Sequence, residues 1–475
     1  MMAQLIFSLI QVCKKMENLT FVQNVLIFIA LNACALLTLN IKKYGKYISF
    51  GLSLIAAITF FSMLYQRDTF LLSDLFSLDG NKVFLLKIVS LLNILMILIN
   101  GFESIEKVKS TLLISYMFLG GVFLLGANEL ITFYVAMETI ALVGYALVAT
   151  SDQEFSREAA VKYLIQGSVV SVIFLLGAAF YLGATGSLSF VGVAVNNQEL
   201  YVIAVGIFIL TACFKLGAFP FHAWIADVYS NVSYGNLATN FFISKIIIGF
   251  KFITLLQILL LECDPHFQDI LIRIIQVIAV MSAFYGNIIA VVQGQFKRII
   301  AYSSVAHTGY MLMMICLNPD DFYEKQLISY LVMYSLTATG VILILNQFSQ
   351  LNNKKDGRDI LLSGFYRNKG LAFLLSVCVL SLGGIPLTSG FSMKYMLFTN
   401  YFKEGFTIEA TSIFISSIVG LAYYVRFVSD LFTEDEEKMK LPKIKSRFSE
   451  TLVHVIILVS IFTFGIAPSL FLGLK

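Results

Sequence analysis

Charged residues are scarce in this sequence. They make up 13% of the 475 residues, whereas 58% are hydrophobic. A soluble globular domain carries about 25% charged residues, so this chain has too few charges to cover a surface in contact with water. The composition excludes a soluble enzyme and a disordered chain, and the basic surface patch of a nucleic-acid-binding protein is missing. It predicts a protein that crosses a membrane repeatedly.

Cysteine and histidine are few and scattered. The six cysteines include no pair at C-x-x-C spacing, and the four histidines include no H-x-x-x-H pair. This argues against an iron–sulfur cluster, a zinc site and a haem held by two histidines. A G-x-x-x-x-G-K-[ST] loop for nucleotide phosphates is also absent. We therefore expect no metal or cofactor in this chain, and the energy for any transport must come from elsewhere.

Long apolar runs fill most of the chain. A spanning helix requires about 20 mostly apolar residues. Runs that satisfy this rule lie at 22–41, 47–65, 83–100, 111–127, 130–149, 160–183, 200–221, 236–260, 271–291, 296–317, 326–348, 370–400, 407–431 and 452–473. The predicted fold class is therefore all-α, a polytopic membrane protein with about 14 transmembrane helices joined by short loops.

Basic residues are distributed unequally over the loops. If the predicted spans are correct, the loops on one side hold roughly twice as many Lys and Arg residues as those on the other. The positive-inside rule places the richer side, which begins with the loop at Lys42–Lys46, in the cytoplasm or the mitochondrial matrix. Both termini are then expected on the opposite, non-cytoplasmic side. The expected location is the bacterial inner membrane, with the mitochondrial inner membrane as the alternative.

A few ionisable residues lie inside apolar runs. A charge near the bilayer centre costs about 2.5–3.5 kcal/mol on insertion scales, so such residues are functional candidates. Lys251 and Arg426 are placed where they can reach the interface or pair locally, which favours a structural role. The residues that predict a proton relay are Glu138, Lys215, Lys245 and Lys394. A carboxylate that moves towards or away from a buried lysine loads or expels a proton.

Two histidines are further candidates for proton transfer. His222 lies two residues after Pro220, directly after the expected break, and His307 lies in the hydroxyl-rich segment Ser303–Tyr310. Histidine titrates near neutral pH and is a common proton shuttle. A hydrogen-bonded core histidine is the alternative interpretation of each.

Two short segments indicate an internal repeat. Leu216–Phe221 (LGAFPF) and Leu382–Leu387 (LGGIPL) resemble each other, with their prolines 166 residues apart. The same shift relates several apolar runs and predicts two five-helix repeats, helices 4–8 and 9–13, the second inverted because the number of spans is odd. Proline removes a backbone donor, so helices 7 and 12 are expected to be broken where polar groups line a cavity. Two ordinary proline kinks are the alternative.

The repeat defines the predicted organisation of the chain. An N-terminal three-helix segment covers 1–110, the first five-helix repeat 111–260 and the second 271–431. A loop and a C-terminal helix cover 432–475.

The motifs around the breaks resemble a known family. They are FKLGAFPFHAW at Phe214–Trp224, ADVY at Ala226–Tyr229, FKRIIAYSSVAHTGY at Phe296–Tyr310, SLGGIP at Ser381–Pro386 and GFSMK at Gly390–Lys394. The pattern is similar to the antiporter-like, proton-translocating subunits of respiratory complex I, over most of residues 110–430. Within that family, the lysine on the twelfth helix and the Asp-Val-Tyr string are most similar to subunit N, which is subunit 2 of the mitochondrial complex.

The resemblance implies a membrane-arm subunit of NADH:quinone oxidoreductase, a non-redox part of that translocase. The family's proton path falls on Glu138, Lys215, Lys245, Lys394, Lys297 and His307. NAD, FMN, iron–sulfur clusters and quinone are expected in other subunits. Subunits of the M and K types and membrane lipids are the expected neighbours, and nucleic acid is not a partner.

Two alternatives share this helix core, a cation/proton antiporter subunit and a hydrogenase-type membrane complex. A sodium carrier would favour several carboxylates at membrane depth, whereas Glu138 stands nearly alone. A structural subunit that pumps nothing is a third interpretation, although buried charges are costly to retain for that role. The segment Ser230–Asn236 lacks the two prolines that the family has after Asp-Val-Tyr, so the turn into the eighth helix is expected to differ.

Overall fold

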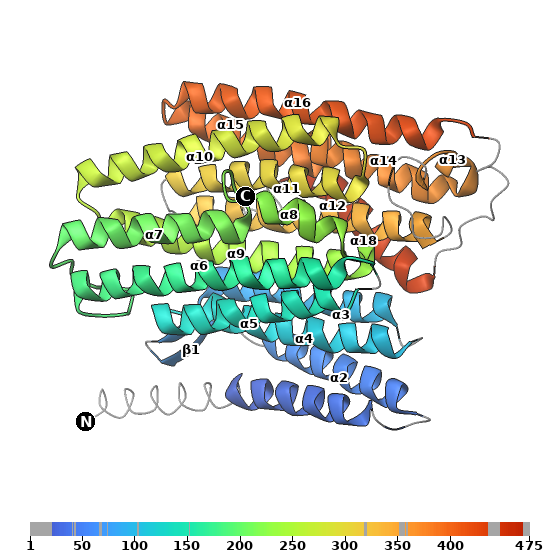
Figure 1. The fold of residues 1–475 in the computed structure, drawn as a ribbon, viewed down its shortest axis with the longest axis horizontal. Coiled ribbons are helices and arrows are strands. Elements are labelled where there is room, and N and C mark those ends of the chain that lie inside the picture. The colour runs from blue at the N-terminus through green and yellow to red at the C-terminus, as the bar shows by residue number, and fades with distance from the viewer. Residues whose placement is uncertain are drawn as a thin grey trace. The chain divides into compact units, whose positions relative to one another are not determined.

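The computed structural model describes residues 21–39, 41, 44–65, 69–73, 75–101, 104–151, 153–317, 321–350, 357, 360–435 and 447–468. Helices dominate this part of the chain (Figure 1), which confirms the predicted fold class. One addition was not predicted. Strands β1 (Phe70–Ser73) and β2 (Phe76–Leu78) form a small antiparallel hairpin where the sequence indicated only a loop. The chain divides into two compact units, Met1–Leu147 with Leu188–Val193, and Val148–Ser187 with Ala194–Lys475.

The first unit is a group of helices with an aromatic core. Its helices are Phe21–Thr38, α2 (Gly45–Tyr65), α3 (Gly80–Asn100), α4 (Ile105–Gly126) and most of α5 (Leu130–Ala149). The rings of Phe28, Phe60 and Phe118 lie 5.3–5.9 Å apart between centroids. Such edge-on aromatic pairs add to the burial of apolar area.

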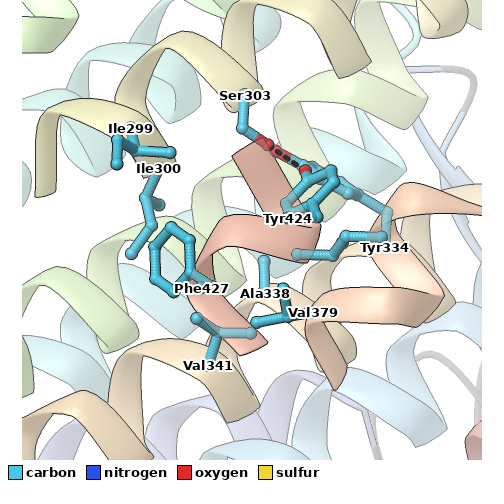
Figure 2. Close-up of a pocket in the computed structure, with 10 residues that line it drawn as sticks. Ile299, Ile300, Ser303, Tyr334, Ala338, Val341, Val379, Tyr424 and Phe427 are labelled. Atoms are coloured by element: carbon cyan, nitrogen blue, oxygen red, sulfur yellow. Dashed lines mark hydrogen bonds between the residues drawn. The ribbon is translucent and has the colours of Figure 1, made fainter. Parts of the chain in front are cut away.

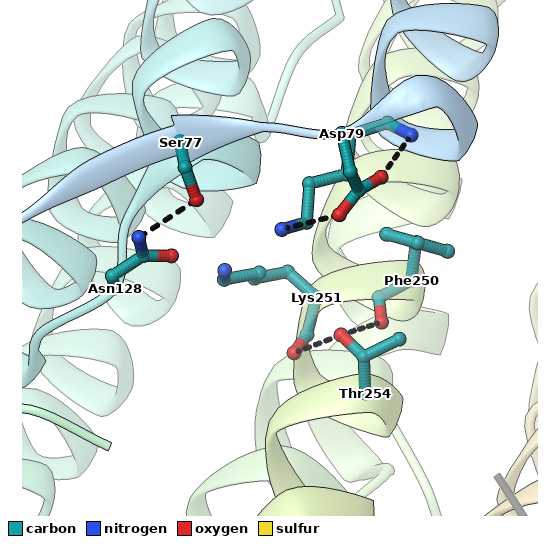
Figure 3. A network of polar contacts seen from close by, with 7 residues as sticks. Ser77, Asp79, Asn128, Phe250, Lys251 and Thr254 are labelled. Atoms are coloured by element: carbon teal, nitrogen blue, oxygen red, sulfur yellow. Dashed lines mark hydrogen bonds and ion pairs between the residues drawn. The ribbon is translucent and has the colours of Figure 1, made fainter. Parts of the chain in front are cut away.

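Polar contacts fix the hairpin of the first unit to its neighbours. The carboxylate of Asp79 accepts a hydrogen bond from the backbone N–H of Lys82, 3.0 Å, and caps the start of α3. Asn128 donates its side-chain amide to the hydroxyl of Ser77 at 2.8 Å (Figure 3). These bonds satisfy backbone and side-chain groups at the hairpin, which lacks the long ladder of a larger sheet.

The second unit contains the remaining helices. They are α6 (Ser156–Thr185), α7 (Gln198–Leu216), α8 (Ala223–Ser230), α9 (Tyr234–Leu261), α10 (Pro265–Val292), α11 (Phe296–Met313) with a 3₁₀ turn at Met314–Cys316, α12 (Asp321–Gln350), α13 (Gly364–Arg367), α14 (Lys369–Gly383), α15 (Ser389–Lys403), α16 (Thr407–Phe432) and α18 (Phe448–Ile466). The apolar part of α12, Tyr323–Ser349, is buried along its most hydrophobic window.

Helices α10 and α11 approach each other very closely. A Cβ atom on Gly286 would lie 2.5 Å from the backbone nitrogen of Ala306, and one on Gly309 would lie 2.4 Å from the carbonyl oxygen of Ala279. Small residues at helix crossings let two backbones come into contact within a membrane. At this crossing the hydroxyl-rich segment of α11, Ser303–Tyr310, packs directly against α10.

Both predicted helix breaks are present. Helix α7 ends at Leu216 before α8 begins at Ala223, and α14 ends at Gly383 before α15 begins at Ser389 (Figure 1). Gly217 and Gly384 follow the ends of α7 and α14 with φ of 75° and 89°, the left-handed conformation that terminates helices and that favours glycine. The starts of α8 and α15 are 166 residues apart, as the repeat predicts.

The described residues include 12 helices that are long and apolar enough to cross a membrane. Two shorter apolar helices, Lys369–Gly383 and Glu450–Ile466, fall within the other two predicted spans. The total of fourteen spans and the four predicted domain boundaries stay predictions.

Candidate functional site

A buried lysine binds the end of the first broken helix. The Nζ atom of Lys245, on α9, donates to the carbonyl oxygen of Leu216 at 2.5 Å, where α7 ends. It also lies 3.1 Å from the hydroxyl of Thr308 on α11, which donates to the same carbonyl oxygen at 2.9 Å. Lys245 is 6% exposed. Three helices that are distant in the sequence thus meet at one backbone oxygen.

A second buried lysine binds the end of the other broken helix. The Nζ atom of Lys394, on α15, donates to the carbonyl oxygens of Leu382 and Gly383 at 2.9 and 3.2 Å. It also donates to the hydroxyl of Ser417 on α16 at 3.1 Å. Lys394 is 9% exposed. It occupies the end of α14 as Lys245 occupies the end of α7.

The two sites use the same electrostatic principle. The last carbonyl groups of a helix lack backbone partners and carry a partial negative charge, which attracts a cation. An interrupted helix places these carbonyls inside the protein instead of at its surface. The two lysines do not occupy equivalent positions of the repeat, since a shift of 166 residues relates Lys394 to Val228 and Lys245 to Thr411. The two lysine sites are therefore similar in their contacts, although the lysines come from positions that the repeat does not relate.

Helix α9 begins with a serine cap. Without prolines, α9 begins at Tyr234 after Ser233, whose hydroxyl accepts from the N–H of Asn236 at 3.4 Å. The N–H of Ser233 donates to the hydroxyl of Ser151 at 2.6 Å. With this start, Lys245 reaches the carbonyl of the residue that directly follows Lys215.

His307 lies among aromatic and hydroxyl groups close to Thr308. Its Nδ1 atom is 3.0 Å from the hydroxyl of Tyr330, and its ring stacks on Tyr334 with centroids 4.2 Å apart. The rings of His307 and Tyr310 form a T-shaped contact with centroids 5.6 Å apart. The Nζ atom of Lys394 also lies 5.4 Å from the Tyr310 ring centroid. The structure thus brings His307 and Lys394 to the same tyrosine.

Sequence reasoning missed a network of amide and hydroxyl groups around Tyr310. Asn287 donates to the hydroxyl of Tyr310 at 3.1 Å and accepts from Tyr423 at 3.0 Å. The hydroxyl of Tyr310 is also 3.1 Å from that of Ser416. Polar residues inside the runs at 271–291 and 407–431 were the available signal. Hydroxyls are common within spans, however, so their pairing between helices cannot be read from one run.

A small cavity lies beside this network. Ser303, Tyr334 and Tyr424 line one part of it, with the Ser303 and Tyr424 hydroxyls 2.5 Å apart, and apolar side chains such as Ile300 and Phe427 line the rest (Figure 2). The volume available to the centre of a water molecule is about 10 Å³, which is room for roughly one water. Because Tyr334 also stacks on His307, the cavity lies next to a protonatable side chain.

Lys297 and His222, two further predicted residues of this unit, each contact an aromatic ring. Lys297 is 2% exposed at the start of α11, with its Nζ atom 4.8 Å from the ring centroid of Tyr234. His222 packs against Tyr285 at 4.5 Å between ring centroids. Lys251 is also buried on α9, one helical turn before Thr254 (Figure 3).

Glu138 and Lys215 lie in different units. Glu138 is on α5 of the first unit, and Lys215 is in the last turn of α7 in the second, next to the carbonyl that Lys245 binds. Their pairing stays a prediction. Among the described residues, no group of three or more His, Cys, Asp or Glu side chains is arranged to hold a metal ion.

This architecture defines a class, polytopic membrane proteins with two broken helices, in which a buried lysine binds the terminal carbonyls at each break. The chain belongs to the family described as NADH:quinone oxidoreductase/Mrp antiporter, whose transmembrane model matches residues 127–420. The resemblance inferred from the motifs is therefore confirmed.

Individual relatives agree with this assignment. NADH-quinone oxidoreductase subunit N of Bdellovibrio bacteriovorus is 35% identical over 66% of this chain and 66% of that protein. Subunit N of Pelobacter propionicus is 32% identical over 70% of this chain and 71% of that protein. A chain of respiratory complex I from Thermus thermophilus has the same fold, with a TM-score of 0.79 and 23% identity over 95% of this chain and 98% of that one.

Proposed function

We propose that this chain is a membrane-arm subunit of an NADH:quinone oxidoreductase, of the subunit N type, and that it moves protons across the membrane. The observation that carries the proposal is the placement of Lys245 and Lys394 on the terminal carbonyls of the two broken helices. Two buried, protonatable groups at corresponding breaks are what a stepwise proton path requires.

The partners of both lysines suit a group that gains and loses a proton. Their hydrogen bonds go to carbonyl and hydroxyl oxygens, and neither lysine has a carboxylate partner within the described part of the chain. A buried carboxylate would hold the ammonium form firmly, because the two charges attract strongly where water is excluded. Carbonyl dipoles bind an ammonium ion more weakly. A change in nearby charge is therefore enough to make the lysine release or take up its proton.

The proposed route runs along the predicted relay residues. Glu138 and Lys215 bias the proton on Lys245, and His307 connects Lys245 with Lys394. Thr308 joins Lys245 to α11 directly beside His307. Lys297 and the water-sized cavity at Ser303 supply the connection towards the basic, cytoplasmic side, and His222 is a secondary candidate. Water molecules complete the steps between side chains.

The proposal also specifies the surroundings of the chain. NADH oxidation and quinone reduction take place in other subunits, which hold the NAD, FMN, iron–sulfur and quinone sites, so this chain is a non-redox part of the translocase. Subunits of the M and K types and lipids are its neighbours. We place it in the bacterial inner membrane with both termini on the non-cytoplasmic side.

The proposal is tested with Lys394→Ala in the assembled complex. NADH-driven proton uptake by inverted membrane vesicles should fall at least tenfold, because the second break loses its protonatable group. Lys403→Ala is the matched control, since Lys403 is exposed at the end of the same helix. Proton uptake at the parent level in Lys394→Ala vesicles that contain the complex would refute the role of this lysine.

A cation/proton antiporter subunit is the alternative, because the description of the matching family covers both kinds of complex. The two are distinguished by purification from the native membrane. An NADH:quinone oxidoreductase subunit should copurify with flavin and iron–sulfur proteins. Purification without them, together with sodium-driven proton movement in vesicles, would favour the antiporter.

A further inference from the structure

Tyr310 contacts two protonatable groups of the second unit. The ammonium of Lys394 lies over its ring, 5.4 Å from the centroid, and the His307 ring meets it in a T-shaped arrangement with an interplanar angle of 90°. The face of an aromatic ring carries partial negative charge. The face of the Tyr310 ring therefore attracts the ammonium of Lys394.

The orientation of this ring is fixed from the hydroxyl end. The Tyr310 hydroxyl accepts from Asn287 on α10 and lies within hydrogen-bond distance of Ser416 on α16. Asn287 is itself held, since it also donates to the carbonyl oxygen of Ser416 at 2.8 Å and accepts from Tyr423. Tyr310 is 1% exposed. Its side chain is thus tied to α10 and α16.

The backbone around the network leaves little room for adjustment. A Cβ atom on Gly420 would lie 2.8 Å from Oδ1 of Asn287, and Gly309, directly before Tyr310, contacts the backbone of α10. Such close packing leaves few voids into which the side chains could move. The network therefore keeps the Tyr310 ring in contact with both His307 and Lys394.

We propose that Tyr310 is a positioning residue for proton transfer between His307 and Lys394. Its ring face holds the Lys394 ammonium at the end of α14, facing His307, and its hydroxyl network keeps the ring in this place. The inference rests on the proposed proton path and adds to it a residue that does not exchange the proton itself. A purely structural alternative is that Tyr310 fills space in the core.

The experiment compares variants that separate the ring from the hydroxyl. Tyr310→Leu removes both and should lower NADH-driven proton uptake about fivefold to tenfold, because the attraction between ring and ammonium is lost. Tyr310→Phe keeps the ring and should lower proton uptake by about twofold, because the hydrogen bonds of the Tyr310 hydroxyl are lost while the attraction between ring and ammonium remains. If Tyr310→Leu prevents assembly, Tyr310→Met provides a ringless side chain of greater length.

Tyr401 provides the matched control. It is fully buried, and its hydroxyl donates to the carbonyl of Met313 at 2.6 Å. Tyr401→Leu removes a comparable volume, and per assembled complex it should retain the parent rate of proton uptake.

Equal losses in Tyr310→Leu and Tyr401→Leu would show that only packing matters, and equal losses in Tyr310→Leu and Tyr310→Phe would exclude a role for the ring. Either result overturns the inference. Normal proton uptake in Lys394→Ala would refute the proposed proton path itself. This variant therefore distinguishes a failure of the proton path from a failure of the inference about Tyr310.

Discussion

The ammonium group of Lys245 and the hydroxyl group of Thr308 share one acceptor, the carbonyl oxygen of Leu216. This contact joins α9 and α11 to the end of α7, and the two donors are themselves 3.1 Å apart. A charge is thereby stabilised inside the protein by one helix end and one hydroxyl. The arrangement accounts for a buried lysine at this depth.

The hydroxyl of Thr308 is the first element to test. Thr308→Val keeps the shape of the side chain but removes the hydrogen bond to the ammonium, a bond to a charged group that contributes about 1.5–3 kcal/mol. Proton uptake per assembled complex should fall about tenfold or more. Thr337→Val is the control, since Thr337 is buried and its hydroxyl only bonds the carbonyl of Met333 within its own helix. Equal activity of the two variants would contradict the importance of the Thr308 contact.

The break in helix 7 depends on Gly217. Gly217→Ala should destabilise the protein by about 2–5 kcal/mol, because a side chain is disfavoured at positive φ and its Cβ atom would overlap Ile225. Thermal denaturation of the detergent-solubilised chain measures this loss. Gly206→Ala in the same helix meets nothing within 4 Å and should leave the transition temperature unchanged or raise it slightly. A similar transition temperature for both variants would show that the left-handed turn is not required.

Ser233 caps the start of α9. Ser233→Ala removes the helix cap and should lower stability by about 0.5–2 kcal/mol. Ser233→Thr retains the hydroxyl and should behave like the parent protein. Thermal denaturation again provides the measurement. If the alanine variant is as stable as the threonine variant, another contact sets the start of this helix.

The sequence was sufficient to predict the helix breaks and the buried lysines. Pro220 and Pro386 interrupt apolar runs beside glycines, and a lysine such as Lys394 is costly in an apolar run, so these features stand out locally. The breaks are present where they were predicted, and Lys245, Lys251 and Lys394 are buried, whereas Lys215 is half-buried and Arg426 is exposed.

Other parts of the site depend on contacts between distant segments. Asn287 and the backbone of Ser416 bond across 129 residues, and neither residue departs from the usual composition of a span. The role of Tyr310 likewise depends on its contacts with His307 and Lys394, which lie on other parts of the chain. The β1–β2 hairpin was missed because its strands have only four and three residues. Short apolar strands give little periodic signal.

The most direct test of the central claim is the number of protons moved per electron in vesicles that contain the assembled complex. We predict that Glu138→Ala and Lys215→Ala each lower this ratio while the complex remains present, because the relay of buried charges is interrupted at its first two members. An unchanged proton-to-electron ratio in both variants would contradict the relay.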